Sequence, residues 1–425
     1  MKIKVKEKDY EAVLAMPRKS HKKPMKQSML FRLLLRVLSA FELRKVRFTC
    51  KKIGMERLGK REPCLVLMNH SSFIDLKIAS TLLFHRPFNI VCTSDGFVGK
   101  NWLMRRLGCI PTTKFVSDVG LVRDMAYAFK TLKSSVLMYP EASYSFDGTA
   151  TPLPDSIGQC LKMFGVPVVM IRTYGAFARD PLYNCLQQRK VDVSAEMEYL
   201  LSPEDIAEKS AEELTAILAA QFDFDYFRWQ KENSIRITEP FRADGLNRVL
   251  YKCPHCFAEG KTEGKGTHIT CHACGKSYEL TEYGELRATE GETEFSHIPD
   301  WYAWERRCVR EELENGTYRL DVSVDISVLV DTQCIYRVGD GRLLHTGEGF
   351  HLTGCEGKLD YTQKPKSSYS LYSDFFWYEI ADVICIGNSK MQYYCFPRMK
   401  GDIVAKARLA AEELYKLSRR VPATV

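Results

Sequence analysis

Between residues 60 and 235, short apolar runs alternate with stretches whose apolar residues recur every three to four positions. The short runs have the length of buried strands, and the longer stretches have the period of helices that cover a sheet. This alternation predicts an α/β domain. The expected strands are Leu65–Met68, Asn89–Thr93, Ser135–Tyr139, Val166–Thr173 and Val191–Tyr199, and the expected helices are Lys100–Leu107, Leu121–Leu132, Ser156–Phe164 and Ser202 to about Lys231.

The pattern changes after residue 318. Up to about residue 400 the chain holds many short strand-like segments rich in Tyr, Val and Ile, separated by glycine-containing turns. An amphipathic stretch from Asp402 to about Arg419 predicts a closing helix. Several antiparallel strands followed by one helix resemble a pleckstrin-homology-like domain. The alternative is a generic β-rich domain that mediates dimerisation.

The chain of 425 residues, with 45% hydrophobic residues, is long enough to bury the cores of two or three domains. We expect five parts in chain order. They are a basic amphipathic N-terminal segment (1–59), the α/β domain (60–240), a cysteine-containing segment (250–282), a linker with helical character (283–317) and the β-rich domain with its closing helix (318–425).

The N-terminal segment combines positive charge with an apolar stripe. Residues 1–60 hold 18 Lys and Arg against 5 Asp and Glu, whereas the whole chain has a net charge of only +8. The apolar run 29–41 carries two arginines and is too short to span a bilayer. This pattern is typical of a helix that lies in an anionic membrane surface. The alternative is a helix packed on the α/β domain, and both can hold at once. The stripe would be Leu30, Leu33, Leu34, Val37, Leu38 and Phe41, preceded by Arg18, Lys19, Lys22, Lys23 and Lys26.

Four of the fifteen cysteines form two C-x-x-C knuckles, fourteen residues apart. Each knuckle presents two thiolates to one tetrahedral ion, and a glycine-rich hairpin lets the second knuckle fold back on the first. We predict a zinc ribbon whose ion is structural. Two redox pairs would need a helix after each motif, and residues 275–280 favour a strand. The ligands would be Cys253, Cys256, Cys271 and Cys274, although His255, His268 and His272 could compete. Unpaired cysteines and no secretory signal indicate a reducing, cytoplasmic compartment.

Polar residues follow two of the expected strands. The stretch N-H-S-S-F-I-D at residues 69–75 follows the first run, so His70 lies at a strand-to-helix junction, with Ser71 or Ser72 as the expected helix N-cap and Asp75 in the first turn. Glu141 follows a second strand. Because sites in open α/β sheets lie at the carboxyl ends of the strands, His70, Asp75 and Glu141 are candidate site residues.

These motifs carry a resemblance to a known family. The order N-H-x-x-x-x-D, then Pro140-Glu-Ala-Ser143, then Val166-Pro-Val-Val resembles the glycerolipid acyltransferases that acylate glycerol 3-phosphate or lysophosphatidic acid. The resemblance covers roughly residues 60–235, so the α/β domain would be the acyltransferase domain. Residues 108–114 also occupy the place of a family G-x-x-x-x-x-R block, with Lys114 replacing the arginine.

The resemblance implies a reaction and a set of site residues. A neutral imidazole can take the proton of an acceptor hydroxyl, so His70 would be the general base and Asp75 would fix its tautomer. Backbone N–H groups at the helix start would hold the oxyanion. The motif offers no placed Ser or Cys nucleophile, so we expect no acyl-enzyme. The expected substrate-binding residues are Glu141, Ser143, Lys114, Arg123 and Arg172.

One departure from the family concerns the acceptor. The family's E-G-T-R segment supplies an arginine to the acceptor phosphate, whereas this chain reads Glu141-Ala-Ser-Tyr144. Either Lys114, Arg123 or Arg172 substitutes for that arginine, because a phosphate needs a cation, or the acceptor carries no phosphate at this position.

The sequence therefore predicts an acyltransferase on a membrane surface. The donor would be acyl-CoA or an acyl-carrier protein and the acceptor a lysophospholipid or related glycerolipid, with the protein cytoplasmic and peripheral on the inner face of an anionic membrane. The alternative is a non-catalytic lipid-binding or scaffold protein with a degenerate acyltransferase fold. Nucleic-acid binding by the ribbon through Lys261, Lys265 and Lys276 is disfavoured, because the basic excess lies elsewhere.

Overall fold

The computed structural model of the chain describes residues 3–17, 20–116, 118–399 and 402–420. It divides into two compact units that are not contiguous in sequence. Unit 2 comprises Ser20–Asp180 and Gln188–Tyr226, and unit 1 comprises Met1–Lys19, Pro181–Gln187 and Phe227–Val425. The predicted N-terminal segment 1–59 is thus shared between the two units, and residues 181–187 and 227–240 of the predicted α/β domain lie in unit 1.

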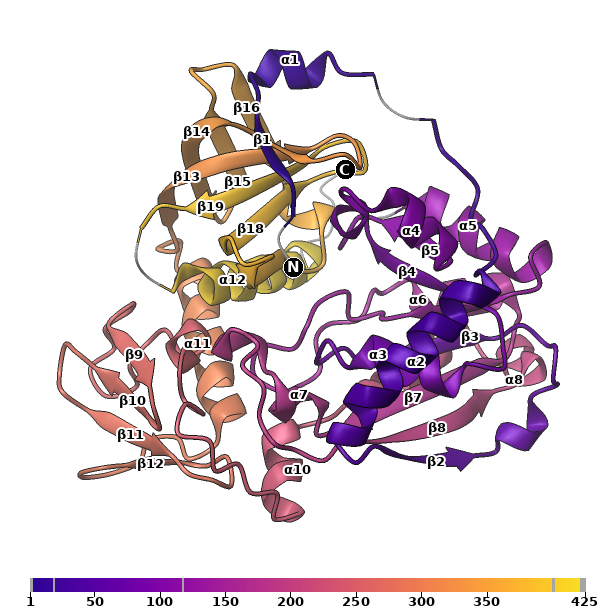
Figure 1. Cartoon of the computed structure of the whole chain (residues 1–425). Helices are drawn as coiled ribbons and strands as arrows, with labels where there is room; N and C mark the ends of the chain where they lie inside the picture. The colour runs from indigo at the N-terminus through magenta and orange to yellow at the C-terminus, as the bar shows by residue number, and fades with distance from the viewer. Residues whose placement is uncertain (1–2, 18–19, 117, 400–401, 421–425) are drawn as a thin grey trace. The chain divides into compact units, whose positions relative to one another are not determined.

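Unit 2 is built on a seven-stranded mixed sheet, as the alternating pattern predicts (Figure 1). The strand order is β2-β8-β7-β3-β6-β4-β5, and neighbouring strands run parallel except for the antiparallel pair β7 and β8. The strands are β2 (Thr49–Ile53), β3 (Leu65–Met68), β4 (Phe88–Thr93), β5 (Cys109–Thr112), β6 (Ser135–Met138), β7 (Val168–Tyr174) and β8 (Ser194–Leu201).

The central strand β3 is buried on both faces, so its side chains divide between two cores. Val66 and Met68 pack on the face that is covered by α2 (Met29–Lys45) and α3 (Asp75–Leu82). Leu65 and Leu67 pack on the opposite face, beneath α5 (Val119–Lys130), α6 (Ile157–Phe164) and α9 (Ala211–Phe222). A run of consecutive apolar residues is what a strand covered on both faces requires. The unit also contains α4 (Asn101–Arg106), α7 (Ala176–Arg179) and the short 3-10 helices Met55–Arg57 and Ser94–Phe97.

The single helix predicted from Ser202 to about Lys231 is wrong, because the chain forms three helices there. These are α8 (Pro203–Glu208), α9 and α10 (Tyr226–Glu232). The break before α9 follows from a capping box at Ser210. The Ser210 hydroxyl accepts from the Glu213 N–H at 3.1 Å, and the Glu213 carboxylate accepts from the Ser210 N–H at 2.7 Å. A residue in this role has extended backbone geometry and ends the preceding helix.

Unit 1 contains a small four-stranded antiparallel sheet and a long helix that follows it. The sheet has the order β12-β11-β10-β9, and its strands are β9 (Thr262–Lys265), β10 (His268–Cys271), β11 (Ser277–Leu280) and β12 (Leu286–Ala288). Helix α11 (Ile298–Glu314) buries Trp301, whose ring meets that of Tyr278 edge-on at 5.2 Å. Residues 283–317 therefore contain a strand and a helix that pack on the small sheet.

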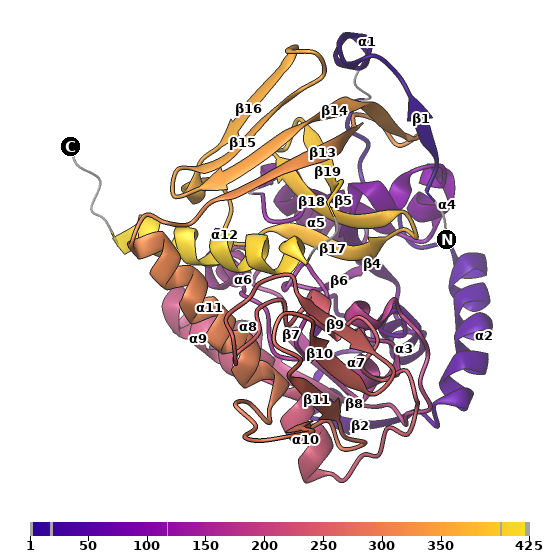
Figure 2. The ribbon, with the colours of Figure 1, turned by 90° about the vertical axis from the view of Figure 1, so that its left-hand side faces the viewer.

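Unit 1 also contains a larger sheet with the order β16-β15-β14-β13-β19-β18-β17. Its strands are β13 (Leu320–Leu329), β14 (Ile335–Thr346), β15 (Gly349–Gly354), β16 (Leu359–Gln363), β17 (Tyr372–Trp377), β18 (Ala381–Gly387) and β19 (Gln392–Pro397), followed by helix α12 (Ile403–Arg420). Figure 2 shows α11 and α12 side by side, and Arg306 of α11 joins them by ion pairs with Glu412 at 2.7 Å and Glu413 at 3.2 Å.

The first described residues complete this larger sheet. Strand β1 (Val5–Glu7) pairs in parallel with residues 335–337 of β14. The following helix α1 (Tyr10–Leu14) buries Tyr10 and Val13, and the hydroxyls of Tyr10 and Tyr393 lie 3.1 Å apart. The short connecting turns at Leu182–Asn184 and Leu246–Arg248 belong to the same unit.

Candidate active site and metal centre

His70 and Asp75 meet at the carboxyl end of β3. His70 Nδ1 lies 3.1 Å from Asp75 Oδ2, and the same oxygen accepts hydrogen bonds from the backbone N–H groups of Ser71 at 2.8 Å and Ser72 at 3.0 Å. The Asp75 side chain is 1% exposed. Because Oδ2 already accepts from two backbone N–H groups, its contact with the ring is that of an acceptor, which orients the imidazole with Nδ1 as the donor.

The predicted cap of α3 is wrong in detail. The helix begins at Asp75, after Ile74, so neither serine is its N-cap. Instead the Ser72 hydroxyl accepts from the Ile74 N–H at 3.2 Å and donates to Asp180. The carboxylate of Asp75 satisfies the N–H groups of Ser71 and Ser72, which are therefore already occupied.

The imidazole of His70 is held in a form suited to accept a proton. Burial lowers the pKa of His70 below its ordinary value, Asp75 opposes this by raising it, and the positive charge of Lys114 lowers it further. The side chain is 21% exposed. With Nδ1 directed at Asp75, Nε2 is the nitrogen left to act as a base near neutral pH.

Glu141 connects the segment after β6 to the loop after β3. One carboxylate oxygen accepts from the backbone N–H of His70 at 2.9 Å, and the other accepts from the backbone N–H of Thr151 at 2.9 Å. Glu141 is buried at 3% exposure. These contacts position the backbone of His70, a role that the sequence pattern alone does not indicate.

Of the other predicted substrate-binding residues, Lys114 lies near enough for its charge to act on His70, and the two arginines lie on the other face of the sheet. Ser143 is buried and donates to the Tyr144 carbonyl at 3.2 Å. Lys114 is half-buried and its charge acts on His70. Arg123, by contrast, is exposed on α5, on the sheet face opposite α3. Arg172 donates to Gln221 of α9 and lies 3.9 Å from Glu196, which places it on that opposite face as well.

Two aromatic rings beside His70 are functional candidates that the motifs do not indicate. The ring centroid of Tyr139 lies 4.1 Å from that of His70 with an interplanar angle of 27°, and the ring of Tyr144 lies 4.2 Å away at 33°. Phe73 in turn meets Tyr144 edge-on at 5.7 Å. The one feature of the sequence that drew attention to either ring was Tyr144, which stands where the family has an arginine.

Residues 49–173 match the family model described as Acyltransferase. They form an acyltransferase domain. No curated protein matches the chain. Among solved structures, the crystal structure of the 1-acyl-sn-glycerophosphate (LPA) acyltransferase PlsC from Thermotoga maritima is similar at 15% identity and a TM-score of 0.36, covering 48% of this chain and 80% of that one. The predicted relationship to the acyltransferases is confirmed by the family model.

Helix α2 lies beside α3 of the acyltransferase domain and leaves its apolar stripe exposed (Figure 1). Polar side chains of α2 bind it to α3 and α7. Glu42 pairs with Lys77 at 3.3 Å and with Arg179 at 2.7 Å, and Arg36 donates to the Thr81 carbonyl. The exposed fractions are 70% for Leu30, 51% for Leu33, 48% for Leu34, 48% for Val37, 55% for Leu38 and 62% for Phe41. The described helices include none that is both long and apolar enough to cross a bilayer.

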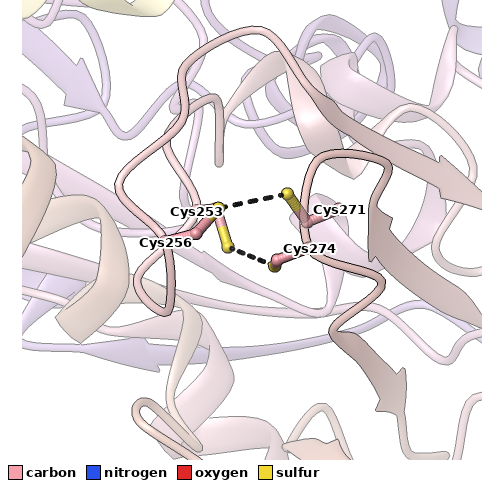
Figure 3. Close-up of side chains that lie close together, drawn as sticks. All are labelled: Cys253, Cys256, Cys271 and Cys274. Atoms are coloured by element: carbon pink, nitrogen blue, oxygen red, sulfur yellow. Dashed lines mark hydrogen bonds between the residues drawn. The ribbon is translucent and has the colours of Figure 1, made fainter.

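In unit 1, the four cysteines of the two knuckles converge (Figure 3). All four sulfur atoms lie within 4.8 Å of one another, with 3.8 Å between Cys253 and Cys274 and 3.7 Å between Cys256 and Cys271. Each of the three competing histidines has another partner: His255 lies 3.0 Å from Glu294, His272 lies 2.8 Å from Glu263, and His268 Nδ1 lies 2.9 Å from the Thr267 hydroxyl. The cluster can therefore hold one metal ion by four thiolates.

The contacts of Glu141 generate a test of its role in the acyltransferase domain. We expect Glu141→Gln to lower kcat with little change in KM. An amide has only one oxygen, so it cannot accept from the N–H groups of both His70 and Thr151, and the His70 backbone is then held less firmly. Misplacement of a reacting group by about 1 Å costs up to roughly 100-fold in rate. Steady-state kinetics on wild type and variant measure the split, and a rise in KM at constant kcat would instead assign Glu141 to substrate binding.

Proposed function

We propose that this protein is an O-acyltransferase that moves a fatty acyl group from an acyl thioester, either acyl-CoA or acyl-carrier protein, to the hydroxyl of a lysophospholipid or related glycerolipid. The observation that carries the proposal is the hydrogen bond from His70 to the buried Asp75 at a strand end of an acyltransferase domain. The rival proposal, a non-catalytic scaffold, gives no reason for a desolvated base with an oriented tautomer.

The proposed reaction is direct transfer without an acyl-enzyme. Nε2 of His70 takes the proton of the acceptor hydroxyl while that oxygen attacks the thioester carbonyl carbon. The resulting tetrahedral intermediate collapses, the carbon–sulfur bond breaks, and the thiolate leaves with the proton that His70 returns. Asp75 stabilises the imidazolium that forms in between. Because the N–H groups of Ser71 and Ser72 already bond to Asp75, other donors have to hold the oxyanion.

Among the cations proposed for the acceptor, Lys114 has the best support, because its charge is close enough to His70 to act on its pKa. A phosphate or a carboxyl group of the acceptor would pair with this ammonium. Arg123 and Arg172 stay predictions, since both lie on the far side of the sheet from α3.

The cysteine cluster of unit 1 is proposed to hold a structural zinc ion. Four thiolates at about 2.3 Å from a tetrahedral zinc lie roughly 3.8 Å from one another. The two sulfur distances of 3.8 and 3.7 Å fit this value. When bound, zinc would fix the two knuckles, and a site closed by four protein ligands leaves no position for substrate.

The C-terminal β-rich domain is proposed to have a pleckstrin-homology-like fold. When its strands are numbered from β13, their order is 4-3-2-1-7-6-5. The first four strands and the last three each form an antiparallel meander, the two meanders pair through β13 and β19, and a helix follows. This arrangement supports the resemblance more specifically than the strand-like segments of the sequence do.

We also propose that the enzyme is cytoplasmic and that α2 lies on an anionic membrane surface. The exposed stripe of α2 and the basic segment that precedes it form the combination that such a surface binds. The ion pairs of Glu42 with Lys77 and Arg179 would then fix the catalytic domain at the lipid, where a lysophospholipid is found. Arg18 and Lys19 of the basic segment lie outside the described residues.

The first test concerns the base. His70→Gln should lower kcat by roughly 100-fold or more, because general base catalysis contributes about 10²–10⁴. Asp75→Asn should also lower kcat strongly through loss of tautomer control. Thiol release from acyl-CoA in the presence of lysophosphatidic acid measures both. His85→Gln, at an exposed histidine of the same domain, is the matched control and should keep its activity. Near wild-type turnover of both site variants would exclude the mechanism.

A second test concerns the metal. The purified chain should contain one zinc ion, measured by elemental analysis, and chelation should unfold residues 250–282, because structural zinc contributes about 10–16 kcal/mol to folding of such small sites. Hydrogen exchange locates the change. A Cys253→Ser/Cys271→Ser double variant should lose the metal, whereas Cys308→Ser on α11 should keep it. Absence of zinc, or loss of turnover upon chelation with exchange unchanged, would contradict a structural zinc.

A third test concerns the membrane. Lys19, Lys22, Lys23 and Lys26 replaced by Gln should weaken binding to anionic vesicles by roughly 100- to 1,000-fold, since each is worth about 1 kcal/mol near the surface. Activity on detergent-dispersed substrate should persist. Added salt should mimic the replacement, because exposed charges are screened within about 10 Å at 0.1 M.

The matched control for this test removes the same charge elsewhere in unit 2, by replacing the exposed Lys51, Lys52, Lys60 and Lys130 with Gln. Co-sedimentation with vesicles should be nearly unchanged for this variant. Equal binding of wild type and the N-terminal variant to anionic and neutral vesicles would show that the segment serves only to pack on the protein.

A further inference from the structure

Four residues of the segment that follows β6 contact His70. The Tyr139 ring stacks on the imidazole, and the Tyr144 ring lies against it at a tilt of 33°. Between them, Glu141 accepts from the His70 N–H at 2.9 Å, and just after them the Ser145 N–H donates to the His70 carbonyl at 3.3 Å. The turn itself closes with a hydrogen bond from the Ala142 N–H to the Tyr139 carbonyl, and Ala142 has a positive φ of 54°.

The positions of the two rings around the imidazole follow from their distances and tilts. Carbon atoms of stacked rings approach no closer than about 3.5 Å. The two rings are inclined to the imidazole by 27° and 33°, with centroids at 4.1 and 4.2 Å, which leaves too little room for both over the same face, so we infer that they lie on opposite faces. The imidazole is therefore enclosed above and below, and only part of its edge meets solvent, in agreement with a side-chain exposure of 21%.

This enclosure and the bond to Asp75 restrict different motions. The hydrogen bond from Nδ1 to Asp75 fixes the direction of the imidazole within its own plane. It does not prevent the plane from tilting about the line that joins Nδ1 to the carboxylate. The two rings prevent that tilt, because the imidazole cannot turn out of plane without displacing Tyr139, which is bound into the domain core, or Tyr144.

We propose that Tyr139 and Tyr144 are positioning residues that hold the plane of the His70 imidazole and exclude water from both of its faces, so that Nε2 is presented edge-on to the acceptor hydroxyl. The proposal rests on the proposed role of His70 as the base. It extends that role to two residues outside the N-H-x-x-x-x-D motif, one of which stands where the family has a cation.

Two opposing effects of the rings on the protonation of His70 have to be weighed. Their faces attract an imidazolium, which is worth about 0.5–1 kcal/mol at a partly exposed site. Their bulk removes water from it, and desolvation is the largest influence on His70 and lowers its pKa. The charged groups that act on the ring are Asp75 from α3 and Lys114 from the segment after β5, while Glu141 from the segment after β6 contacts the His70 backbone N–H. None of them changes in a tyrosine variant, so opening one face should raise the pKa of His70.

The test uses Tyr144, because Tyr139, although it is half-buried like Tyr144, packs against the hydrophobic core, so that its removal would also disturb the packing of the domain. In the full-length protein, Tyr144→Ala should lower kcat by roughly 10- to 100-fold with little change in KM. It should also move the acidic limb of the pH profile to higher pH. Tyr144→Phe keeps the ring and should restore both. Tyr199→Ala, which removes a buried tyrosine from β8 of the same domain, is the matched control for general loss of packing and should leave the pH profile in place.

A second readout does not depend on turnover. The rate at which diethyl pyrocarbonate modifies His70, followed by peptide mass spectrometry against pH, gives the midpoint for deprotonation of this one side chain. We expect a higher midpoint in Tyr144→Ala than in wild type and an unchanged midpoint in Tyr144→Phe. If the labelling behaves in this way but wild type transfers no acyl group, the proposed function fails and the positioning of His70 stands.

Other outcomes overturn the proposal. An unchanged or lower midpoint in Tyr144→Ala would show that the rings do not keep water from His70. A Phe variant that behaves like the Ala variant would assign the effect to the tyrosine hydroxyl instead of the ring face. A raised KM at constant kcat in Tyr144→Ala would place Tyr144 against the substrate.

Discussion

A carboxylate that is removed from water has to be surrounded by donors, and Asp75 imposes this requirement on the loop between β3 and α3. Three N–H groups meet it at one oxygen, Oδ2: the backbone groups of Ser71 and Ser72 and the ring of His70. Oδ1 is buried and has no hydrogen-bond partner among the described residues. Because those donors come from consecutive positions, the chain has to curl around the carboxylate before it can enter the helix. The direction of the His70 ring, the late start of α3 and the use of Ser72 for a different contact all follow from this one buried charge.

The same loop is anchored from two further directions. On one side, the segment after β6 holds the backbone of His70 by Glu141 and Ser145. On the other, the Ser72 hydroxyl donates to Asp180, Asp180 pairs with Arg179, and Arg179 pairs with Glu42 of α2. A continuous path of polar contacts thus runs from the amphipathic helix to the residues between His70 and Asp75. The geometry of the site is secured by elements that are far apart in the sequence.

Much of this arrangement could be predicted from the sequence, and the failures have identifiable physical causes. The strand of Leu65–Met68 and the four-cysteine cluster were visible because uninterrupted apolar runs and paired cysteines each have few structural explanations. The placement of Arg172 could not be predicted from the sequence. The side of a strand on which a residue lies depends on the register of the strand, and the register is set by strands elsewhere in the chain. The cap of α3 was mispredicted because a serine is a common cap, whereas a carboxylate in the first turn can take over its donors. The packing of Tyr139 and Tyr144 against His70 depends on a turn with positive φ at Ala142, a residue type that gives no hint of it.

Strand β1 has a consequence for the order in which the protein is made and folded. Its partner, residues 335–337 of β14, is synthesised more than three hundred positions later. All residues of unit 2 are synthesised before β14, so the acyltransferase domain can fold while β1 is still unpaired. Unit 1, by contrast, cannot complete its larger sheet until β19 (Gln392–Pro397) has been synthesised. During that interval Val5–Glu7 lack the strand with which they pair, and Tyr10 and Val13 of α1 lack the surface that buries them, so these residues are open to misassociation.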